Sequence, residues 1–272
     1  MTSGPIRIVI VGPGRAGMSL ALAAHREGHT IAGVLGRDGA AAAAAMVDSL
    51  DLRWGEPLPA TDLIVVAVRD DLIEAVAERL GPQTAPAVHL SGLTPTGVLL
   101  PLGSRIGSFH PLQTLPTPEA GSGALSGAFV AVTTADETLR ASLHELARSI
   151  GAHPFDLEEP AKALYHAGAA SVSNFVTTAL ALGSQAFAAA GVPFEVARPL
   201  VETAVAKAFE LGPVAALTGP IARGDAGTVA AERNAVAAVS AELEQTFVEL
   251  ARATARLAGQ ERRMEEVLDG DR

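Results

Sequence analysis

The sequence predicts a two-domain α/β protein, with a doubly wound parallel sheet followed by an all-helical domain. Three observations predict this class. Short β-branched runs alternate with helical patterns in the first half of the 272 residues, and a glycine-rich turn joins the first strand to the first helix. Strand patterns end near residue 157, after which alanine-rich helical patterns continue almost to the end. We therefore expect domains at residues 1–157 and 158–272.

Each element of the first domain follows from its apolar pattern. Almost continuously apolar runs are typical of parallel strands covered on both faces, and they occur at 6–11, 31–35, 63–68 and 87–90. Helical patterns occur at 16–27, 39–50, 72–80 and 136–150. From residue 91 to 127 the chain is rich in Gly and Pro, which indicates loops, and further strands are expected at 105–109 and 128–133.

The second domain is expected to hold helices at 161–190, 194–211 and 227–258, separated by Gly191-Val192-Pro193 and Gly219-Pro220. The first of these helices is apolar nearly all the way round, which is typical of a helix buried on every side. We expect a second copy of the chain to cover part of it, in a homodimer formed through this domain. Its internal polar side chains argue against a membrane span.

Composition excludes several classes of partner and site. With 30 acidic and 20 basic residues the formal charge is -10, which opposes the binding of nucleic acid. The lack of cysteine excludes disulfides, thiolate metal sites and a cysteine nucleophile, and it fits a reducing compartment. Residues 1–5 lead into an apolar strand without a leader pattern, so we expect a cytoplasmic protein without a membrane partner.

The glycine-rich turn carries the clearest chemical signal. It has the spacing G-x-G-x-x-G, and its residues are Gly12, Pro13, Gly14, Arg15, Ala16 and Gly17. The first glycine permits the tight turn, the second lets the backbone approach a pyrophosphate, and the third lets helix and strand pack closely. The helix N-terminus then faces the anion. Between a strand and a helix, this motif predicts a Rossmann domain that binds a dinucleotide.

The end of the second strand bears on which dinucleotide binds. A carboxylate at this place accepts a hydrogen bond from the ribose of NAD, whereas an arginine suits the 2′-phosphate of NADP. Gly36 leaves room for a phosphate and Arg37 supplies a guanidinium, which favours NADP(H). The next residue, Asp38, keeps NAD(H) open as the less favoured cofactor.

Residues at the carboxyl ends of other strands should line the nicotinamide end of the site. Val68 and Arg69 close the strand at 63–68, and Arg69 could bind a phosphate or a substrate carboxylate. Ser91 and Gly92 could offer a hydroxyl and a close backbone approach, although a simple turn is equally compatible. His110 stands between a short strand and a proline, which makes it a candidate for substrate binding or a structural histidine.

The helix predicted at 161–190 begins with a polar stripe. The i to i+4 spacing places Lys162 and His166 on one face, Ser173 continues that face, and Asn174 lies beside it. A lysine in a partly desolvated cleft can polarise a carbonyl and deliver a proton to the alkoxide formed when hydride arrives. The alternative is a lysine whose ammonium stays in water while its stem covers apolar surface. No metal site is expected.

Three stretches together resemble a known superfamily. They are Ser91-Gly92 with residues 107–113, residues 162–174, and residues 218–225. On these the chain resembles the 6-phosphogluconate-dehydrogenase-like superfamily, in which a Rossmann domain precedes a helical dimerisation domain. Within it, the chain is similar to Rossmann-like proteins with a C-terminal domain of unknown function, some of which are an alternative type of ketopantoate reductase. The likeness spans nearly the whole chain.

The resemblance implies an NADP(H)-dependent reductase with Lys162 as the acid. In the polar stripe, Asn174 is a further catalytic candidate, and His166 could itself donate to the substrate oxygen or relay a proton. More distant members carry Lys-x-x-x-Asn, so His166 departs from their pattern. In the loop at 218–225, Arg223 is a candidate for the substrate carboxylate and Asp225 for substrate binding, although Asp225 also fits a helix cap.

We therefore expect NADPH-dependent reduction of a small 2-oxo acid, with 2-dehydropantoate of pantothenate biosynthesis as the candidate. The alternatives are imine reduction, as in the related pyrroline-5-carboxylate reductases, and a non-catalytic NADP(H)-binding sensor, which would not need Lys162.

Overall fold

The computed structural model describes residues 4–269 and divides after Ala170 into two compact units. The sequence predicts a boundary at residue 157, where the last strand ends. The contacts of Lys162 and Tyr165 with strand residues explain why the first unit continues beyond that point.

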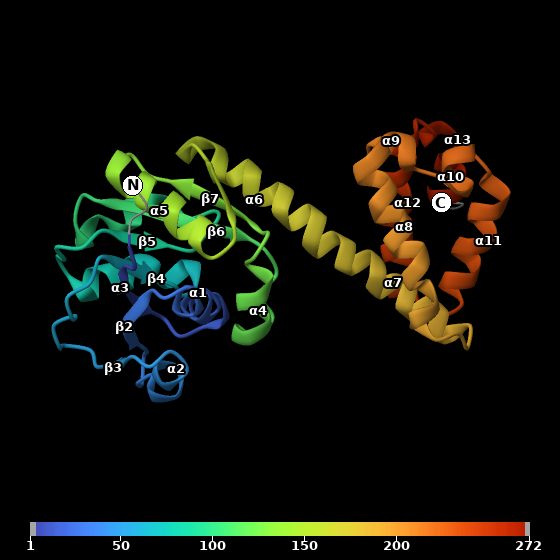
Figure 1. The fold of residues 1–272 in the computed structure, drawn as a ribbon. Coiled ribbons are helices and arrows are strands. Elements are labelled where there is room, and N and C mark those ends of the chain that lie inside the picture. The colour runs from blue at the N-terminus through green and yellow to red at the C-terminus, as the bar shows by residue number, and fades with distance from the viewer. Residues whose placement is uncertain (1–3, 270–272) are drawn as a thin grey trace. The chain divides into compact units, whose positions relative to one another are not determined.

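The first unit is built on one eight-stranded sheet in the order β3-β2-β1-β4-β5-β6-β7-β8 (Figure 1). All neighbouring pairs are parallel except β6 and β7. The strands are β1 (Arg7–Val11), β2 (Thr30–Leu35), β3 (Leu50–Leu52), β4 (Leu63–Val66), β5 (Ala87–His89), β6 (Ile106–Leu112), β7 (Phe129–Thr133) and β8 (His153–Asp156). The first six strands have the Rossmann order, so the carboxyl ends of β1, β4 and β5 share one edge.

Helices cover both faces of this sheet, which explains its almost wholly apolar strands. One buried layer joins the sheet to α1 and α5, and the other joins it to α3 and a 3₁₀ segment, η2. The elements are α1 (Arg15–Arg26), α2 (Ala41–Ala45), η1 (Asp70–Leu72), α3 (Ile73–Leu80), η2 (Thr96–Leu102), α4 (Pro118–Ala124), α5 (Glu137–Ser149), η3 (Glu159–Ala161) and α6 (Lys162–Ala170).

The helix expected at 39–50 is wrong in its second half. Only α2 is helical there, and Asp48 adopts a positive φ of 49° before the chain enters β3. β3 pairs in parallel with β2, and Leu52 occupies the space above Gly33. The run of alanines at 41–45 predicts the helix. It does not predict that the helix ends at Ala45, because that end depends on the pairing of β3 with β2, which is a tertiary contact.

The Gly-rich stretch and the end of the first unit contain elements that the local pattern does not predict. α4 begins at the cap Thr117, and Gly121 lies so close to Ser19 of α1 that any side chain there would collide. β8 contains Pro154, which is compatible with its place at the edge of the sheet.

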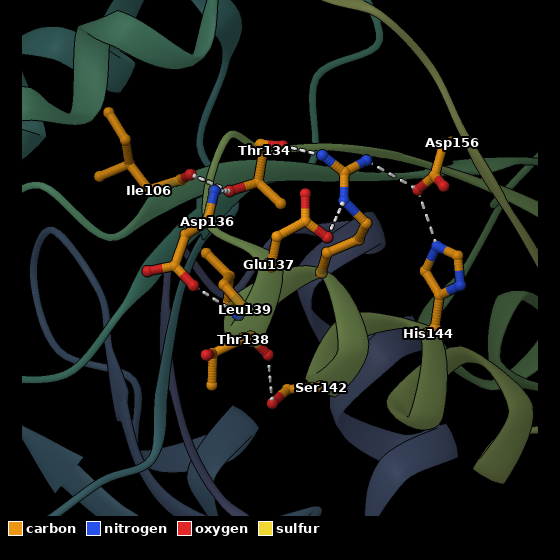
Figure 2. A network of polar contacts seen from close by, with 10 residues as sticks. Ile106, Thr134, Asp136, Glu137, Thr138, Leu139, Ser142, His144 and Asp156 are labelled. Carbon is orange, nitrogen blue, oxygen red and sulfur yellow. Dashed lines mark hydrogen bonds and ion pairs between the residues drawn. The ribbon is translucent and has the colours of Figure 1, made fainter.

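A polar network fixes the end of β8 to α5 (Figure 2). Asp156 Oδ1 accepts from His144 Nε2 at 2.9 Å and pairs with Arg140 at 3.1 Å, and Arg140 also donates to the Thr134 carbonyl. Burial alone would raise the pKa of Asp156, but the hydrogen bonds from Arg140 and His144 and the charges of these two side chains together outweigh it, so the pKa is lowered. This network anchors the chain just before the segment that leads to Lys162.

The second unit is wholly helical in its described part. The helix predicted at 161–190 is formed by three successive helical segments. The first, α6, belongs to the first unit, and it is followed by a π-helical turn, η4 (Ser171–Phe175), and by α7 (Val176–Ala189). The helix predicted at 227–258 is interrupted, because the Ser240 side chain accepts from Leu243 N and starts a new helix. The remaining elements are η5 (Phe194–Ala197), α8 (Arg198–Leu211), α9 (Pro213–Ala216), α10 (Pro220–Arg223), α11 (Ala226–Ala237), α12 (Ala241–Ala258) and α13 (Glu261–Asp269). No helix between residues 4 and 269 has the length and apolarity needed to cross a membrane.

Candidate active site

The glycine turn between β1 and α1 has the geometry that the motif predicts. Gly12 has a φ of 104°, and a Cβ there would lie 2.7 Å from the Ala67 carbonyl oxygen. A Cβ on Gly17 would lie 2.6 Å from the Gly12 carbonyl oxygen and 2.7 Å from the Ala67 Cβ. Both glycines are therefore required by the close packing of β1, α1 and the residues after β4.

Gly14 differs from its two neighbours in the motif. A Cβ placed on it would meet only the Ala67 carbonyl oxygen, at 3.8 Å, so the fold itself leaves this position open. Gly14 is also the N-cap of α1, a helix of 12 residues whose first turn receives no hydrogen bond from a cap side chain. Open backbone beside uncapped amides suits a pyrophosphate, so these residues fit a dinucleotide.

The residues that follow β2 are those expected to determine whether NADP(H) or NAD(H) binds. Gly36 cannot hold a side chain, because a Cβ would collide with the Gly39 carbonyl. Arg37 is exposed, and its Nε donates to Asp38 at 3.1 Å. Arg53, which follows β3, lies against Gly39 and donates to Asp51 at 2.7 Å. Arg53 is a second guanidinium near Gly36 that sequence reasoning missed, because its position depends on β3.

The residues after β4 line the same edge. Val68 packs beside Gly12, and Arg69 is exposed with its guanidinium held by Asp71 through hydrogen bonds of 3.0 and 2.8 Å. Arg69 is thus oriented at the surface by a carboxylate.

Lys162 lies inside the first unit, with 2% of its surface exposed. Its Nζ donates to Ser108 Oγ at 2.7 Å and to the Ser91 carbonyl at 3.4 Å, so a residue of β6 and the turn after β5 hold the ammonium. Burial lowers the pKa of Lys162, while the charges of Glu159 and Asp70 oppose that shift. A buried lysine with a lowered pKa is suited to giving up a proton. The alternative of a solvated lysine is therefore wrong for this conformation.

The helix start that carries Lys162 is fixed by a carboxylate clamp. Glu159 accepts from Thr96 N at 2.9 Å through one oxygen and from Thr96 Oγ1 at 2.8 Å through the other. These bonds join η3 to η2. They fix the backbone just before Lys162, and so help to orient its side chain toward Ser91 and Ser108.

Ser91 is buried and its hydroxyl is already engaged. Its Oγ bonds to Asp70 Oδ2 at 2.6 Å and to Thr94 Oγ1 at 2.9 Å, and it accepts from the amide of Thr94 at 2.9 Å. In this conformation the hydroxyl stabilises the turn after β5, and the carbonyl of Ser91 is the part that faces Lys162.

His110 on β6 forms a cluster with residues of α6. Its Nδ1 lies 2.9 Å from the hydroxyl of Tyr165, and its ring centroid is 6.3 Å from that of His166. Burial, followed by the charges of His166 and Lys162, lowers the pKa of His110 to about 4, so the ring is neutral near pH 7. Burial raises the pKa of Tyr165 to about 12, so the phenol stays protonated.

Gly92 makes room for this histidine. A Cβ on Gly92 would lie 2.8 to 3.0 Å from three atoms of the His110 ring. Sequence reasoning selected Gly92 as a cofactor contact, and the structure shows in addition that it packs against His110.

The structure brings together more residues than the sequence patterns selected. Ser108, Tyr165, Asp70 and Glu159 were missed, because each acts through a partner on another strand or helix. In the sequence these four residues share only one weak indication of a functional role. Each lies within a few residues of a strand end or of Lys162.

The candidate residues of the second unit are described within that unit alone. Ser173 and Asn174 lie in the π-helical turn, where their carbonyl oxygens accept from Thr177 and Thr178. Arg223 ends α10. Asp225 caps α11 through bonds to Thr228, which also lower the pKa of this carboxyl, so the helix-cap interpretation of Asp225 is confirmed.

No group of three His, Cys, Asp or Glu side chains within residues 4–269 is arranged to hold a metal ion. Among the histidines, His29 is bonded to the Ile6 amide and to Ser149, which is a structural role.

Residues 128–254 match the family described as Domain of unknown function (DUF2520). The DUF2520 match begins one residue before β7 and ends within α12, so it includes the whole polar stripe from Lys162 to Asn174. No curated protein matches the sequence.

Solved structures resemble the chain over nearly its whole length. A candidate NADP oxidoreductase of Bacteroides fragilis has a TM-score of 0.81 at 22% identity, covering 93% of this chain and 98% of that one. A reductive aminase of Aspergillus terreus, solved with NADPH and ethyl levulinate, has a TM-score of 0.67 at 19% identity, covering 98% of each chain. An imine reductase of Bacillus cereus has a TM-score of 0.60 at 15% identity, covering 97% and 99%. These likenesses confirm the predicted fold, a Rossmann domain followed by a helical domain.

Proposed function

We propose that the chain is an NADPH-dependent reductase of a small 2-oxo acid, with 2-dehydropantoate as the candidate substrate. The observation that carries the proposal is the position of Lys162. Its buried ammonium is bonded to Ser91, which follows β5, and to Ser108, which pairs with His89 at the carboxyl end of β5, so it lies at the same edge of the sheet as the glycine turn. In a sheet of this order, that edge is where a dinucleotide and its substrate meet.

The glycine turn would hold the cofactor. Gly14 and the uncapped first turn of α1, from Arg15 to Gly17, would receive the pyrophosphate, and Arg37 the 2′-phosphate. Val68, Arg69 and the backbone at 91–92 would line its further course. When bound, the reduced nicotinamide supplies a hydride.

Lys162 would supply the proton that completes the reduction. A hydride added to the carbonyl carbon leaves charge on oxygen, and an ammonium can stabilise that charge and then transfer a proton to it. The pKa of Lys162 is lowered by burial, which makes this transfer easier. Ser108 would keep Nζ in place, because its hydroxyl accepts from it at 2.7 Å.

Imine reduction is the second candidate, because the similar structures include a reductive aminase and an imine reductase. An imine is reduced most easily as a cationic iminium, which a neighbouring ammonium repels. The ammonium of Lys162 therefore favours a neutral carbonyl over a cationic iminium as the group that is reduced, and this charge argument decides our preference.

A substrate panel tests the proposal. Purified protein is mixed with NADPH and either 2-dehydropantoate or pyrroline-5-carboxylate, and loss of reduced nicotinamide is followed by absorbance. We expect turnover with the oxo acid. Faster turnover of the imine would replace the proposal with its alternative, and binding of NADPH without turnover of either would favour a sensor.

Arg37 is expected to determine the cofactor preference. The variant Arg37→Ala should weaken NADPH binding by roughly 10- to 100-fold, the effect of losing one charge-assisted contact, and leave NADH binding unchanged. Titration of both cofactors by fluorescence measures this. Arg26→Ala, in the last turn of α1, is the matched control and should leave both affinities unchanged. Equal weakening for NADH would show that Arg37 does not contact a 2′-phosphate.

We also propose that the second unit forms a homodimer. None of the residues of α7 is buried within the chain, and α8 exposes Leu200 and Phe209, the latter at 88%. Exposed large apolar side chains on neighbouring helices are typical of an interface.

Phe209→Glu tests the proposed dimer. A buried, unpaired charge at an interface costs several kcal/mol, so this variant should shift the mass measured by light scattering from dimer to monomer. Ala253→Glu, an exposed position on α12, is the control and should stay dimeric. A wild-type chain that is monomeric at micromolar concentration would contradict the proposal.

A further inference from the structure

His110 is held more firmly than a substrate-contacting side chain on a loop would be. It lies on β6, its Nδ1 is 2.9 Å from the Tyr165 hydroxyl, and its ring is packed directly on Gly92. Tyr165 is in turn placed by its edge-on contact with Phe155, at a centroid distance of 5.9 Å. The ring of His110 therefore has one defined orientation.

The bond to Tyr165 also defines which ring nitrogen carries the proton. A phenol hydroxyl is both donor and acceptor, whereas a neutral imidazole has one nitrogen of each kind. If Tyr165 donates to Nδ1, the hydroxyl proton and the Nδ1 lone pair are both paired, and only the Nε2–H is left over. The reverse arrangement would leave two groups over, the Tyr165 hydroxyl proton and the Nε2 lone pair, because among the described residues the hydroxyl bonds only to His110. The proton of His110 thus belongs on Nε2.

Nε2 of His110 is an available donor. Within residues 4–269 no hydrogen bond to this atom is formed, and the surroundings include the imidazole of His166 and the charge of Lys162, which together act on the ring more strongly than the opposite charge of Asp70. A neutral N–H donor in surroundings with positive charge suits an anionic oxygen. It can bind that oxygen without a change in its own protonation.

We propose that Tyr165 holds His110 as the Nε2–H tautomer, and that this N–H binds an oxygen of the substrate carboxylate. The inference rests on the proposed reductase function, which it extends by assigning one group that recognises the acid. Tyr165 and Gly92 are positioning residues that act through His110.

Nuclear magnetic resonance of ¹⁵N-histidine-labelled full-length protein tests the tautomer without any need for turnover. The chain contains 7 histidines, and the signal missing in His110→Gln identifies the ring. We expect the wild type to show a protonated Nε2 and an unprotonated Nδ1, and Tyr165→Phe to show a mixture of tautomers. A wild-type ring protonated on Nδ1 overturns the proposal.

The same sample tests the ligand. On addition of 2-dehydropantoate to the NADP⁺ complex, the Nε2–H signal of His110 should shift, and addition of the corresponding amide should not shift it. Catalysis without this shift overturns the inference alone. A shift without catalysis retains the inference and overturns the proposed reductase function.

Kinetics with matched substrates separates carboxylate binding from general damage. His110→Ala should raise KM for the oxo acid by about 10- to 100-fold, the value of one hydrogen bond to a charged group, with little change for the amide. His110→Gln should retain most of the binding, because its amide can donate from a similar place. Equal losses for acid and amide would contradict a contact with the carboxylate.

Discussion

Replacing Lys162 by Ala is expected to lower kcat by about a hundredfold or more, since general acid catalysis contributes of that order. NADPH binding should be largely kept, because the glycine turn is formed without this residue. Stopped-flow and fluorescence titration measure the two quantities. Lys207→Ala, which removes an exposed lysine of α8, is the control and should leave both unchanged.

If Lys162 is the acid, the activity should also depend on pH in a defined direction. An acid must be protonated to act, so kcat/KM should fall as the pH rises through the pKa of Lys162, which burial places below the usual 10.5. In Lys162→Met, which keeps the length of the side chain, this alkaline loss should disappear together with most of the rate. An unchanged kcat in a folded Lys162→Met protein would remove the lysine from the mechanism.

Replacing Gly14 by Ala is expected to weaken cofactor binding strongly while leaving the fold intact. The added methyl has space within the protein, with its nearest neighbour 3.8 Å away, but it occupies the surface that a pyrophosphate would approach. We expect about a 100-fold weaker affinity for NADPH, equivalent to roughly 2.7 kcal/mol. Titration together with thermal unfolding checks both halves of the prediction.

Gly17→Ala is the contrasting variant. Its methyl would lie 2.6 Å from the Gly12 carbonyl oxygen, so we expect a loss of roughly 1–3 kcal/mol of unfolding free energy, as for overpacking. If Gly14→Ala binds NADPH normally, the glycine turn is an ordinary strand-to-helix connection.

The parts of the fold that follow local patterns were predictable from the sequence. The apolar run before Gly12 predicts β1 because a strand covered on both faces carries no polar residue in its middle. Elements fixed by tertiary contacts were not predictable. β3 exists because it pairs with β2, and α4 because Gly121 permits its approach to Ser19.

The candidate site divides in the same way. The spacing of the glycine turn is local, and so is the placement of Lys162 at the start of a helix. The partners of Lys162 depend on strand order, because Ser108 is 54 residues away along the chain and Ser91 is 71. The sequence does not single out Tyr165 for a further reason. Lys162 and His166 have the i to i+4 spacing of residues on one helix face, whereas the role of Tyr165 follows only from its contact with His110.

A single-turnover experiment tests the central claim most directly. Protein carrying bound NADPH is mixed rapidly with excess 2-dehydropantoate, and the absorbance of reduced nicotinamide is followed. We predict that the bound NADPH is oxidised in one fast phase, and that Lys162→Met slows this phase by about a hundredfold or more. NADPH that stays bound and reduced in the wild-type protein would contradict the assignment of this site as a 2-oxo acid reductase.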